Sequence, residues 1–112
     1  MAVGNCVTRS KIQPLRKGLL EFLVLRIVSG EKVYVTDLLK ALADTDFATQ
    51  EGTLCPLLGK LRREDLVDYE WQESDAGPPR KYYKLTAKGR QQLEELNGYW
   101  KYINTVINKL GR

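Results

Sequence analysis

Apolar residues recur every three or four positions in four stretches of this chain, a spacing that places them on one face of an α-helix. In the first stretch Pro14 stands where a helix can begin and Gly30 where one can end, so a helix is predicted over residues 15–29. Thr36 and Thr86 are suitable N-caps for two of the later helices. The other three stretches predict helices near 36–44, over 51–65 and over 87–110.

Two shorter stretches alternate polar and apolar residues, the period of a half-exposed β-strand. They are LVDYEWQ at 66–72 and RKYYKLT at 80–86, and the Gly- and Pro-containing segment between them suits a turn. Pro78 and Pro79 lack amide donors and are expected to end the ladder of hydrogen bonds. Alternation is expected to bury one of the tyrosines at 82 and 83 and to expose the other. Three helices followed by an antiparallel hairpin predict a mainly α fold with a small β hairpin (α+β), a winged helix-turn-helix.

Length and composition are those of an ordinary globular protein. The 112 residues suffice for one winged-helix unit, which we divide into an N-terminal tail (1–14), a DNA-binding domain (15–86) and a C-terminal dimerisation helix (87–112). No apolar run approaches a membrane span and no segment reads as a secretory signal, which predicts a cytoplasmic protein without a membrane partner. A net charge of +4 is compatible with a nucleic-acid partner.

Residues suited to catalysis or metal binding are sparse. The sequence contains no histidine, and its two cysteines, Cys6 and Cys55, lie far apart, which removes the usual zinc ligand sets. It has no Gly-rich phosphate loop after a strand and no nucleophile with an evident base. We therefore expect no metal, no cofactor and no enzymatic activity.

The third predicted helix has two different faces. Its leucines share one side, and the residues opposite are small and then cationic: Gly52, Thr53, Pro56, Gly59, Lys60 and Arg63. Small residues allow close approach, Lys60 and Arg63 can reach phosphates or guanine edges, and Thr53 can donate near the helix start, which together predict a major-groove helix. Gln50, just before the helix, is a weaker candidate for the same contact. The alternative is a solvated face whose cations serve solubility alone.

The predicted wing carries its cations at the base of its tip. Arg80 and Lys81 directly follow the two prolines. A stiff tip costs little entropy to dock, so these cations are predicted to grip the sugar–phosphate wall of a minor groove beside the third helix. Alternatively, Arg80 pairs with Glu70 or Glu73 across the hairpin, which would not exclude a DNA contact.

The last predicted helix carries a narrow apolar seam. Its members alternate three and four residues apart: Leu93, Leu96, Trp100, Ile103, Ile107 and Leu110. Such an a/d pattern suits packing against another helix, which predicts a two-fold homodimer. The two DNA-binding units of that dimer would meet half-sites about one helical turn of DNA apart. The alternative is packing against helix 15–29 of the same chain, and both can occur because the seam is longer than that helix.

A family resemblance covers residues 15–110 and is densest over 51–89. The stretch EGTLCPLLGKLRREDLVDYEWQESDAGPPRKYYKLTAKGRQQL closely resembles the PadR family of bacterial transcriptional regulators, whose signature is a GTLYPLL helix followed by a Gly/Pro-rich, RKYY-containing wing. The short C-terminal part is similar to the small branch of that family, which includes a lactococcal multidrug-binding repressor. Two features depart from the family: Cys55 stands where Tyr is usual, and EKVYVTDLL replaces a YGYEI-like start of the second helix.

The resemblance implies a repressor that binds double-stranded DNA as a homodimer. In the multidrug-binding repressor a Trp at the position of Trp100 lines an inter-subunit pore and stacks on aromatic drugs, so a small aromatic effector at Trp100 is also implied, whereas other members have a filled dimer core. Cys55 invites a redox-switch interpretation, over which we favour a packing role. The alternative function is a winged-helix module for protein contact without DNA binding, in which the seam is the functional surface.

Overall fold

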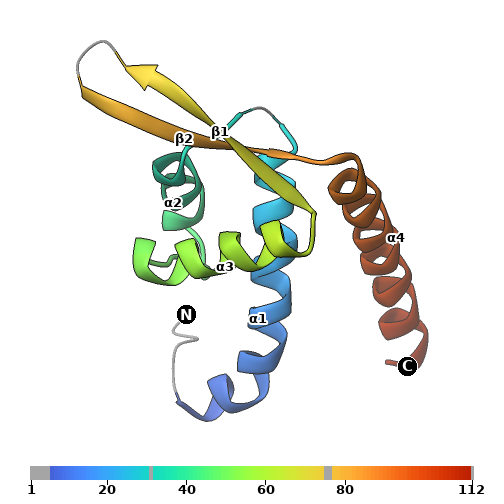
Figure 1. Cartoon of the computed structure of the whole chain (residues 1–112). Coiled ribbons are helices and arrows are strands. Elements are labelled where there is room, and N and C mark those ends of the chain that lie inside the picture. Colours follow the sequence, from blue (N-terminus) through green and yellow to red (C-terminus); the bar gives the residue numbers. More distant parts are fainter. Residues whose placement is uncertain (1–5, 31, 75–76, 112) are drawn as a thin grey trace.

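The computed structural model describes residues 6–30, 32–74 and 77–111, with the backbone alone for 6–10 and 74 (Figure 1). Among the described residues, none of the helices combines the length and the hydropathy that a transmembrane segment requires. The predicted winged helix-turn-helix with a long C-terminal helix is confirmed. In chain order the elements are α1 (Cys6–Val28), α2 (Val35–Ala43), α3 (Glu51–Arg63), β1 (Val67–Ser74), β2 (Gly77–Leu85) and α4 (Ala87–Leu110).

The hydrophobic core lies where α1, α2 and α3 meet the base of the hairpin, and Figure 1 shows α3 crossing in front of α1. The largest of the fully buried side chains are five leucines, each at most 2% exposed: Leu25, Leu38, Leu54, Leu58 and Leu61. Burying a leucine in this way stabilises the fold by about 1.5–3 kcal/mol relative to an exposed position. Because three of these leucines belong to α3, their burial holds that helix in one rotation about its axis.

The prolines of the wing lie inside a strand. β1 and β2 pair antiparallel, and their register shifts between Gln72 and Ser74. Pro78 and Pro79 are part of β2 at this irregularity, so the expectation that they end the ladder is wrong. A bulge accommodates residues without an amide donor because the partner strand does not need their hydrogen bonds.

Both tyrosines of the wing are buried, Tyr82 at 5% and Tyr83 at 7% exposure, so the expectation of one exposed ring is wrong. The segment between α1 and α2 runs along β2, where the main chains of Val33 and Tyr83 exchange hydrogen bonds of 3.1 and 2.7 Å. Tyr34 then packs edge-on against Tyr82, with ring centroids 5.9 Å apart. This segment pairs with the edge of β2 that a two-stranded ribbon would leave open, and the Tyr34 ring packs against Tyr82.

The first helix starts earlier than expected. It begins at Cys6 and contains Pro14 in its interior, whereas a start at residue 15 was predicted. Residues 6–13 include neither glycine nor proline, so the helix continues through them, and Pro14 removes only the bond to the carbonyl of Ser10. Much of the segment expected to be a tail is therefore helical.

The second helix uses a cap other than the predicted one. It begins at Val35, and the amide of Tyr34 donates to the carboxylate of Asp37 at 2.9 Å. Thr36, the predicted cap, lies within the first turn instead. The carboxylate near the helix start also suits the positive end of the helix dipole.

The end of α3, the base of the hairpin and the start of α4 meet at one junction. Asp65 turns the chain with a φ of 68°, and the amide of Thr86 donates to the carbonyl of Leu66 at 3.1 Å. Thr86 caps α4 as predicted: its hydroxyl accepts from the amide of Gly89 at 2.9 Å and donates to the carbonyl of Asp65 at 2.7 Å. A Cβ at Gly89 would lie 2.0 Å from the carbonyl oxygen of Leu66, so the first turn of α4 touches the backbone of the residue just before β1.

We expect Gly89→Ala to lower the free energy of unfolding by about 2–4 kcal/mol, because the added methyl meets backbone that cannot rotate away. Gly98→Ala in the same helix is the matched control, since a Cβ there has open space, and it should stabilise the protein by about 0.5–1 kcal/mol. Urea unfolding of both variants measures the difference. Equal stability of the two would show that the junction tolerates a side chain.

Candidate nucleic-acid interface

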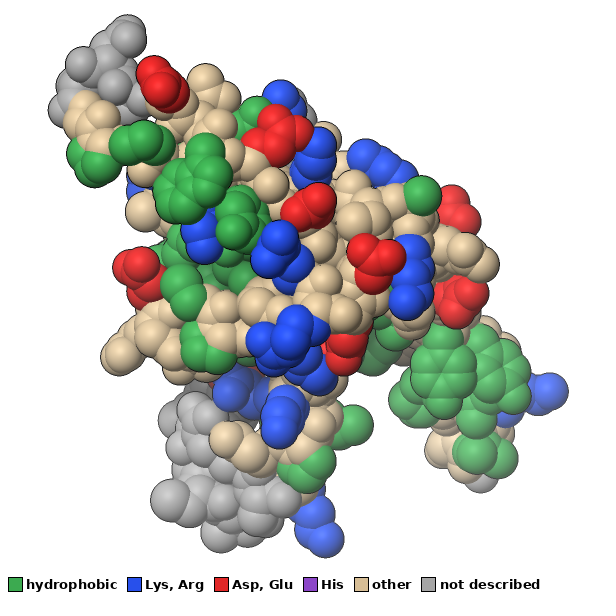
Figure 2. Space-filling model, in the orientation of Figure 1, with side chains coloured by type: hydrophobic (Ala, Val, Ile, Leu, Met, Phe, Trp, Pro, Cys, Tyr) green, Lys and Arg blue, Asp and Glu red, His purple; other side chains and the backbone are tan. Residues whose placement is uncertain are grey.

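The outward face of α3 carries the predicted residues. Leu54, Leu58 and Leu61 are fully buried on the opposite side of the helix. Gly59 is half-buried, and the other members of the face are exposed: Gly52, Thr53, Pro56, Lys60 and Arg63. Figure 2 shows Lys and Arg side chains gathered over this part of the molecule. The face is therefore small near the start of α3 and cationic near its end.

The two cations of this face differ in their surroundings. The ammonium of Lys60 lies 2.7 Å from the carboxylate of Glu21 on α1 and 4.0 Å from that of Glu64. The hydrogen bond with Glu21 raises the pKa of Lys60 above its ordinary value. Within the described residues Arg63 forms no ion pair. Arg63 can thus meet a phosphate directly, whereas Lys60 must first exchange Glu21 for it.

The start of α3 adjoins cations of α1 that the sequence analysis missed. Gln50 is the exposed N-cap residue, and its side chain makes no capping hydrogen bond. Thr53 lines a shallow hollow together with Arg16 and Lys17. Arg16 is paired with Asp46 at 3.3 Å. On the sequence these cations look like part of a solvated helix face, and only the crossing of α1 and α3 brings them to the candidate interface.

Arg80 lies on the hairpin face away from α3. Its guanidinium carbon stands 4.1 Å from the centroid of the Tyr34 ring, and the guanidinium donates to the hydroxyl of Thr36 at 3.2 Å. Both contacts tie β2 to the first turn of α2. A guanidinium on an aromatic face is stabilised by about 0.5–1 kcal/mol at an exposed site. Arg80 therefore has internal partners that a DNA phosphate would have to replace or share.

The predicted alternative for Arg80, an ion pair with Glu70 or Glu73, is not formed among the described residues. Glu70 is instead bonded to the ammonium of Lys84 and accepts a hydrogen bond from Tyr82. The bond with Lys84 is the main reason that the pKa of Glu70 is lowered. The register places Lys84 and Arg80 at equal steps on either side of Tyr82, the residue opposite Glu70. Arg80 instead contacts Tyr34 and Thr36, which leaves Lys84 to pair with Glu70.

Lys81 lies on the face toward α3. Its ammonium is 4.4 Å from the ring centroid of Tyr69 and 5.5 Å from that of Trp71. Arg62 of α3 stands over the same Tyr69 ring at 4.5 Å and also pairs with Asp68 at 3.4 Å. Tyr69 is thus shared by a cation from α3 and a cation from the wing. No role was predicted for Arg62, because helical spacing places it at the flank of the leucine stripe.

Cys55 is exposed, so the packing role that we favoured for it is wrong. Its position is 100° around the helix from Leu54, at the border of the buried stripe rather than within it. The hydroxyl of Tyr83 on the wing has its pKa raised, chiefly by burial.

The seam of α4 is covered only near its start. Arg26 of α1 donates to the side-chain oxygen of Asn97 at 3.0 Å, so packing within the chain covers this half. Figure 2 shows hydrophobic side chains gathered at the far end of α4. The seam is most exposed at its far end: Leu93 is buried, Leu96 and Ile103 are half-buried, and Trp100, Ile107 and Leu110 are 47%, 59% and 78% exposed.

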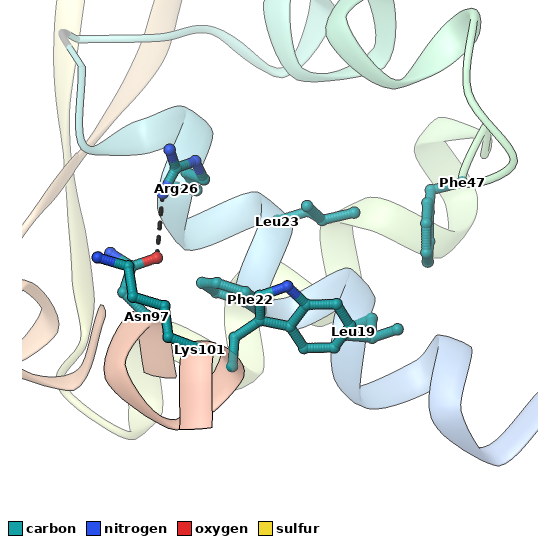
Figure 3. Close-up of a pocket in the computed structure, with 8 residues that line it drawn as sticks. Leu19, Phe22, Leu23, Arg26, Phe47, Asn97 and Lys101 are labelled. Carbon is teal, nitrogen blue, oxygen red and sulfur yellow. Dashed lines mark hydrogen bonds between the residues drawn. The ribbon is translucent and has the colours of Figure 1, made fainter. Parts of the chain in front are cut away.

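A pocket of about 520 Å³ lies between α1, the α2–α3 connection and α4 (Figure 3). Its walls are apolar, with Phe22 from α1, Phe47 from the connection and Trp100 from α4. The Arg26–Asn97 hydrogen bond lies at one side. A second hollow of about 430 Å³ also includes Phe22 and Trp100. The indole of Trp100 therefore borders two hollows that open between the long helices.

A helix-turn-helix whose second helix turns a cationic face outward, followed by a hairpin wing, defines the winged-helix class of DNA-binding folds. The model of the "Transcriptional regulator PadR-like family" matches residues 24–95, and this chain belongs to that family. The family consists of transcriptional regulators and not of enzymes, as expected for this chain.

Three solved structures are similar over nearly the whole chain. A PadR-like transcription factor from Bacteroides fragilis is 42% identical with a TM-score of 0.79, covering 90% of this chain and 98% of its own. A PadR-like transcriptional regulator from Bacillus cereus is 38% identical with a TM-score of 0.78, covering 88% and 97%. A PadR family transcriptional regulator from Eggerthella lenta is 34% identical with a TM-score of 0.79, covering 93% and 91%.

Proposed function

We propose that this protein is a sequence-specific DNA-binding repressor that acts as a homodimer and is released by a small-molecule effector. One observation carries the DNA-binding part: the ring of Tyr69 is contacted by Arg62 of α3 and by Lys81 of the wing. The end of α3 and one wing cation therefore lie on the same side of the hairpin. That arrangement suits a major groove beside α3 and the neighbouring minor groove beside the wing.

In this proposal phosphate contacts supply affinity and the α3 face supplies sequence choice. Lys81 and Lys17 meet phosphates, and Arg63 with Thr53 or Gln50 reaches base edges. Lys60 also contacts a phosphate once that phosphate replaces Glu21 as its partner. Arg80 acts mainly from the other face of the wing, where it holds the hairpin against α2.

The homodimer is supported by the exposed half of the seam. Trp100, Ile107 and Leu110 form a row on one helix, and each is at least 47% exposed in the single chain. Burying apolar surface of this kind stabilises an interface by about 25 cal/mol per Å² of area removed from water. A two-fold axis would pair the row with its own copy, and the two α3 helices would then reach successive half-sites.

A module for protein contact without DNA binding is the alternative, and the dependence of retention on salt separates the two. Binding to phosphates releases counterions, so DNA affinity should fall steeply as the salt concentration rises. Binding of a protein through the apolar seam should not. Selection of bound duplexes from a random pool by the purified protein then tests sequence specificity.

We expect Arg63→Ala to weaken binding to the selected duplex by roughly 1–3 kcal/mol, as for the loss of a base contact. Lys60→Ala should cost less, since Lys60 loses its bond to Glu21 on docking. Arg90→Ala, which removes an exposed cation from α4, is the matched control and should leave affinity unchanged. Gel-shift titrations at one salt concentration measure all three. Unchanged affinity in both α3 variants would rule out α3 as the reading helix.

We expect Ile103→Glu to yield a monomer, because a carboxylate buried in an apolar interface without a partner is strongly unfavourable. Duplex affinity should fall with it, since each subunit makes only half of the contacts. Thr105→Glu adds the same charge on the exposed side of α4 and is the control. Light scattering reports the mass of each variant. A dimer that survives Ile103→Glu would refute the seam as its interface.

An effector would bind beside Trp100. We expect a planar aromatic compound in the pocket to quench the fluorescence of Trp100 and to lower duplex affinity, because it contacts both α4 and Phe47 ahead of α3. Phe47→Ala should keep the quenching and reduce the effect on DNA. Trp100→Phe is the control for quenching of Trp71. Quenching that persists in Trp100→Phe would place the compound elsewhere.

A further inference from the structure

The hairpin face toward α3 carries a series in which cations and aromatic rings alternate. In spatial order it runs from α3 toward the tip as Arg62, Tyr69, Lys81 and Trp71, and we call these four residues the wing ladder. The cation-to-centroid distances are 4.5, 4.4 and 5.5 Å, and the rings of Tyr69 and Trp71 meet edge to face with centroids 6.1 Å apart.

Trp71 is the exposed end of the wing ladder. Its side chain is 61% exposed, whereas Tyr69 is half-buried and Tyr83 is buried. The register pairs Trp71 with Lys81, so indole and ammonium stand side by side across the strands. In Figure 2, hydrophobic side chains lie over the hairpin with Lys and Arg side chains among them, on the same side of the molecule as α3. The core does not need this indole, since the core is closed by residues nearer the base of the hairpin.

The charge around Trp71 favours a polyanion. Lys81 and Arg62 lie along the wing ladder, and Arg63 follows on α3. Of the carboxylates on β1, Glu70 is held by Lys84 on the opposite face and Asp68 by Arg62. Glu73 lies beyond Trp71 toward the tip. Between the end of α3 and Trp71, the surface therefore combines cations with one flat apolar side chain.

We propose that Trp71 is a DNA-contacting residue whose indole packs against the sugar rings of the minor groove beside α3. The proposal rests on the proposed DNA-binding function and adds a contact of a different kind. Apolar side chains that enter a minor groove remove sugar and base surface from water, and their effect does not depend on charge. Tyr69 and Lys81 hold the indole before docking, so little side-chain entropy is lost when the groove closes on it.

The roles of Lys81 and Trp71 differ in their dependence on salt. Lys81 neutralises a phosphate, so its loss should make the slope of log affinity against log salt shallower by about one contact. Trp71 displaces water from an apolar surface, so its loss should lower affinity equally at every salt concentration. A DNA duplex offers phosphates for Lys81 and a groove for Trp71, whereas heparin offers anionic groups without a groove.

The experiment compares Trp71→Ala, Trp71→Phe and Lys81→Gln in the full chain. Trp71→Ala should weaken binding to every duplex about threefold to tenfold with an unchanged salt slope, as for the loss of one apolar contact. Trp71→Phe should retain most of the affinity. Lys81→Gln should reduce the salt slope. Heparin retention should fall only for Lys81→Gln.

Labelling with 5-fluorotryptophan gives a direct readout, because the chain has two tryptophans and Trp71→Phe identifies the resonance of Trp71. Adding duplex should shift that resonance and abolish its difference between H₂O and D₂O. A duplex that binds while the Trp71 resonance keeps its solvent shift would overturn the proposal and leave the proposed function standing. Equal loss of duplex and heparin binding in Trp71→Ala would also overturn it. A protein that binds no duplex at any salt concentration would refute both.

Discussion

The contact between Leu66 and Gly89 is the constraint on which the arrangement of the functional elements depends. The carbonyl of Leu66 occupies the space that a Cβ at Gly89 would fill, and it also accepts the amide of Thr86. No side chain lies between the two backbones to absorb a displacement. Leu66 follows shortly after the end of α3 at Arg63, and Gly89 lies in the first turn of α4, so this contact joins the end of the helix proposed to read DNA to the start of the helix proposed to form the dimer. A rotation of α4 must therefore move the end of α3 or the base of the wing.

Three cations of the candidate interface already have partners within the chain, whereas Arg63 forms no ion pair within the described residues. Lys60 is bonded to Glu21, Arg80 to Tyr34 and Lys81 to Tyr69. Surface contacts of these kinds contribute little net free energy, so a phosphate can replace them, but breaking them reduces the net free energy of binding. The free energy of DNA binding is then the difference between the contacts made with DNA and the contacts within the chain that they replace. Such competition weakens binding to any isolated anion and favours a ligand that satisfies several cations at once, as a duplex does.

The sequence predicted the order and type of the elements because each has its own period and its own boundary residues. Thr86 and its neighbours are an example, since a local cap is visible without the fold. What could not be predicted were contacts between distant segments. Tyr82 is buried because Tyr34, from the connection between α1 and α2, packs against it. Arg80 contacts the ring of Tyr34 instead of its expected partners, Glu70 and Glu73. Cys55 stands at the edge of a helical stripe, where a small error in the assumed rotation decides between burial and exposure.

An effector bound beside Trp100 would act on α3 through contacts within one chain as well as through the dimer interface. Phe47 forms part of the wall of the pocket beside Trp100, and three residues later Gln50 is the N-cap of α3. A ligand that contacts both would act on α3 from its start through the α2–α3 connection and from its end through the junction at Leu66. It can lower DNA affinity only if it binds the DNA-competent arrangement less tightly than the alternative one. Since the backbone contact at the junction leaves no room for a displacement, the two arrangements would differ in the α2–α3 connection.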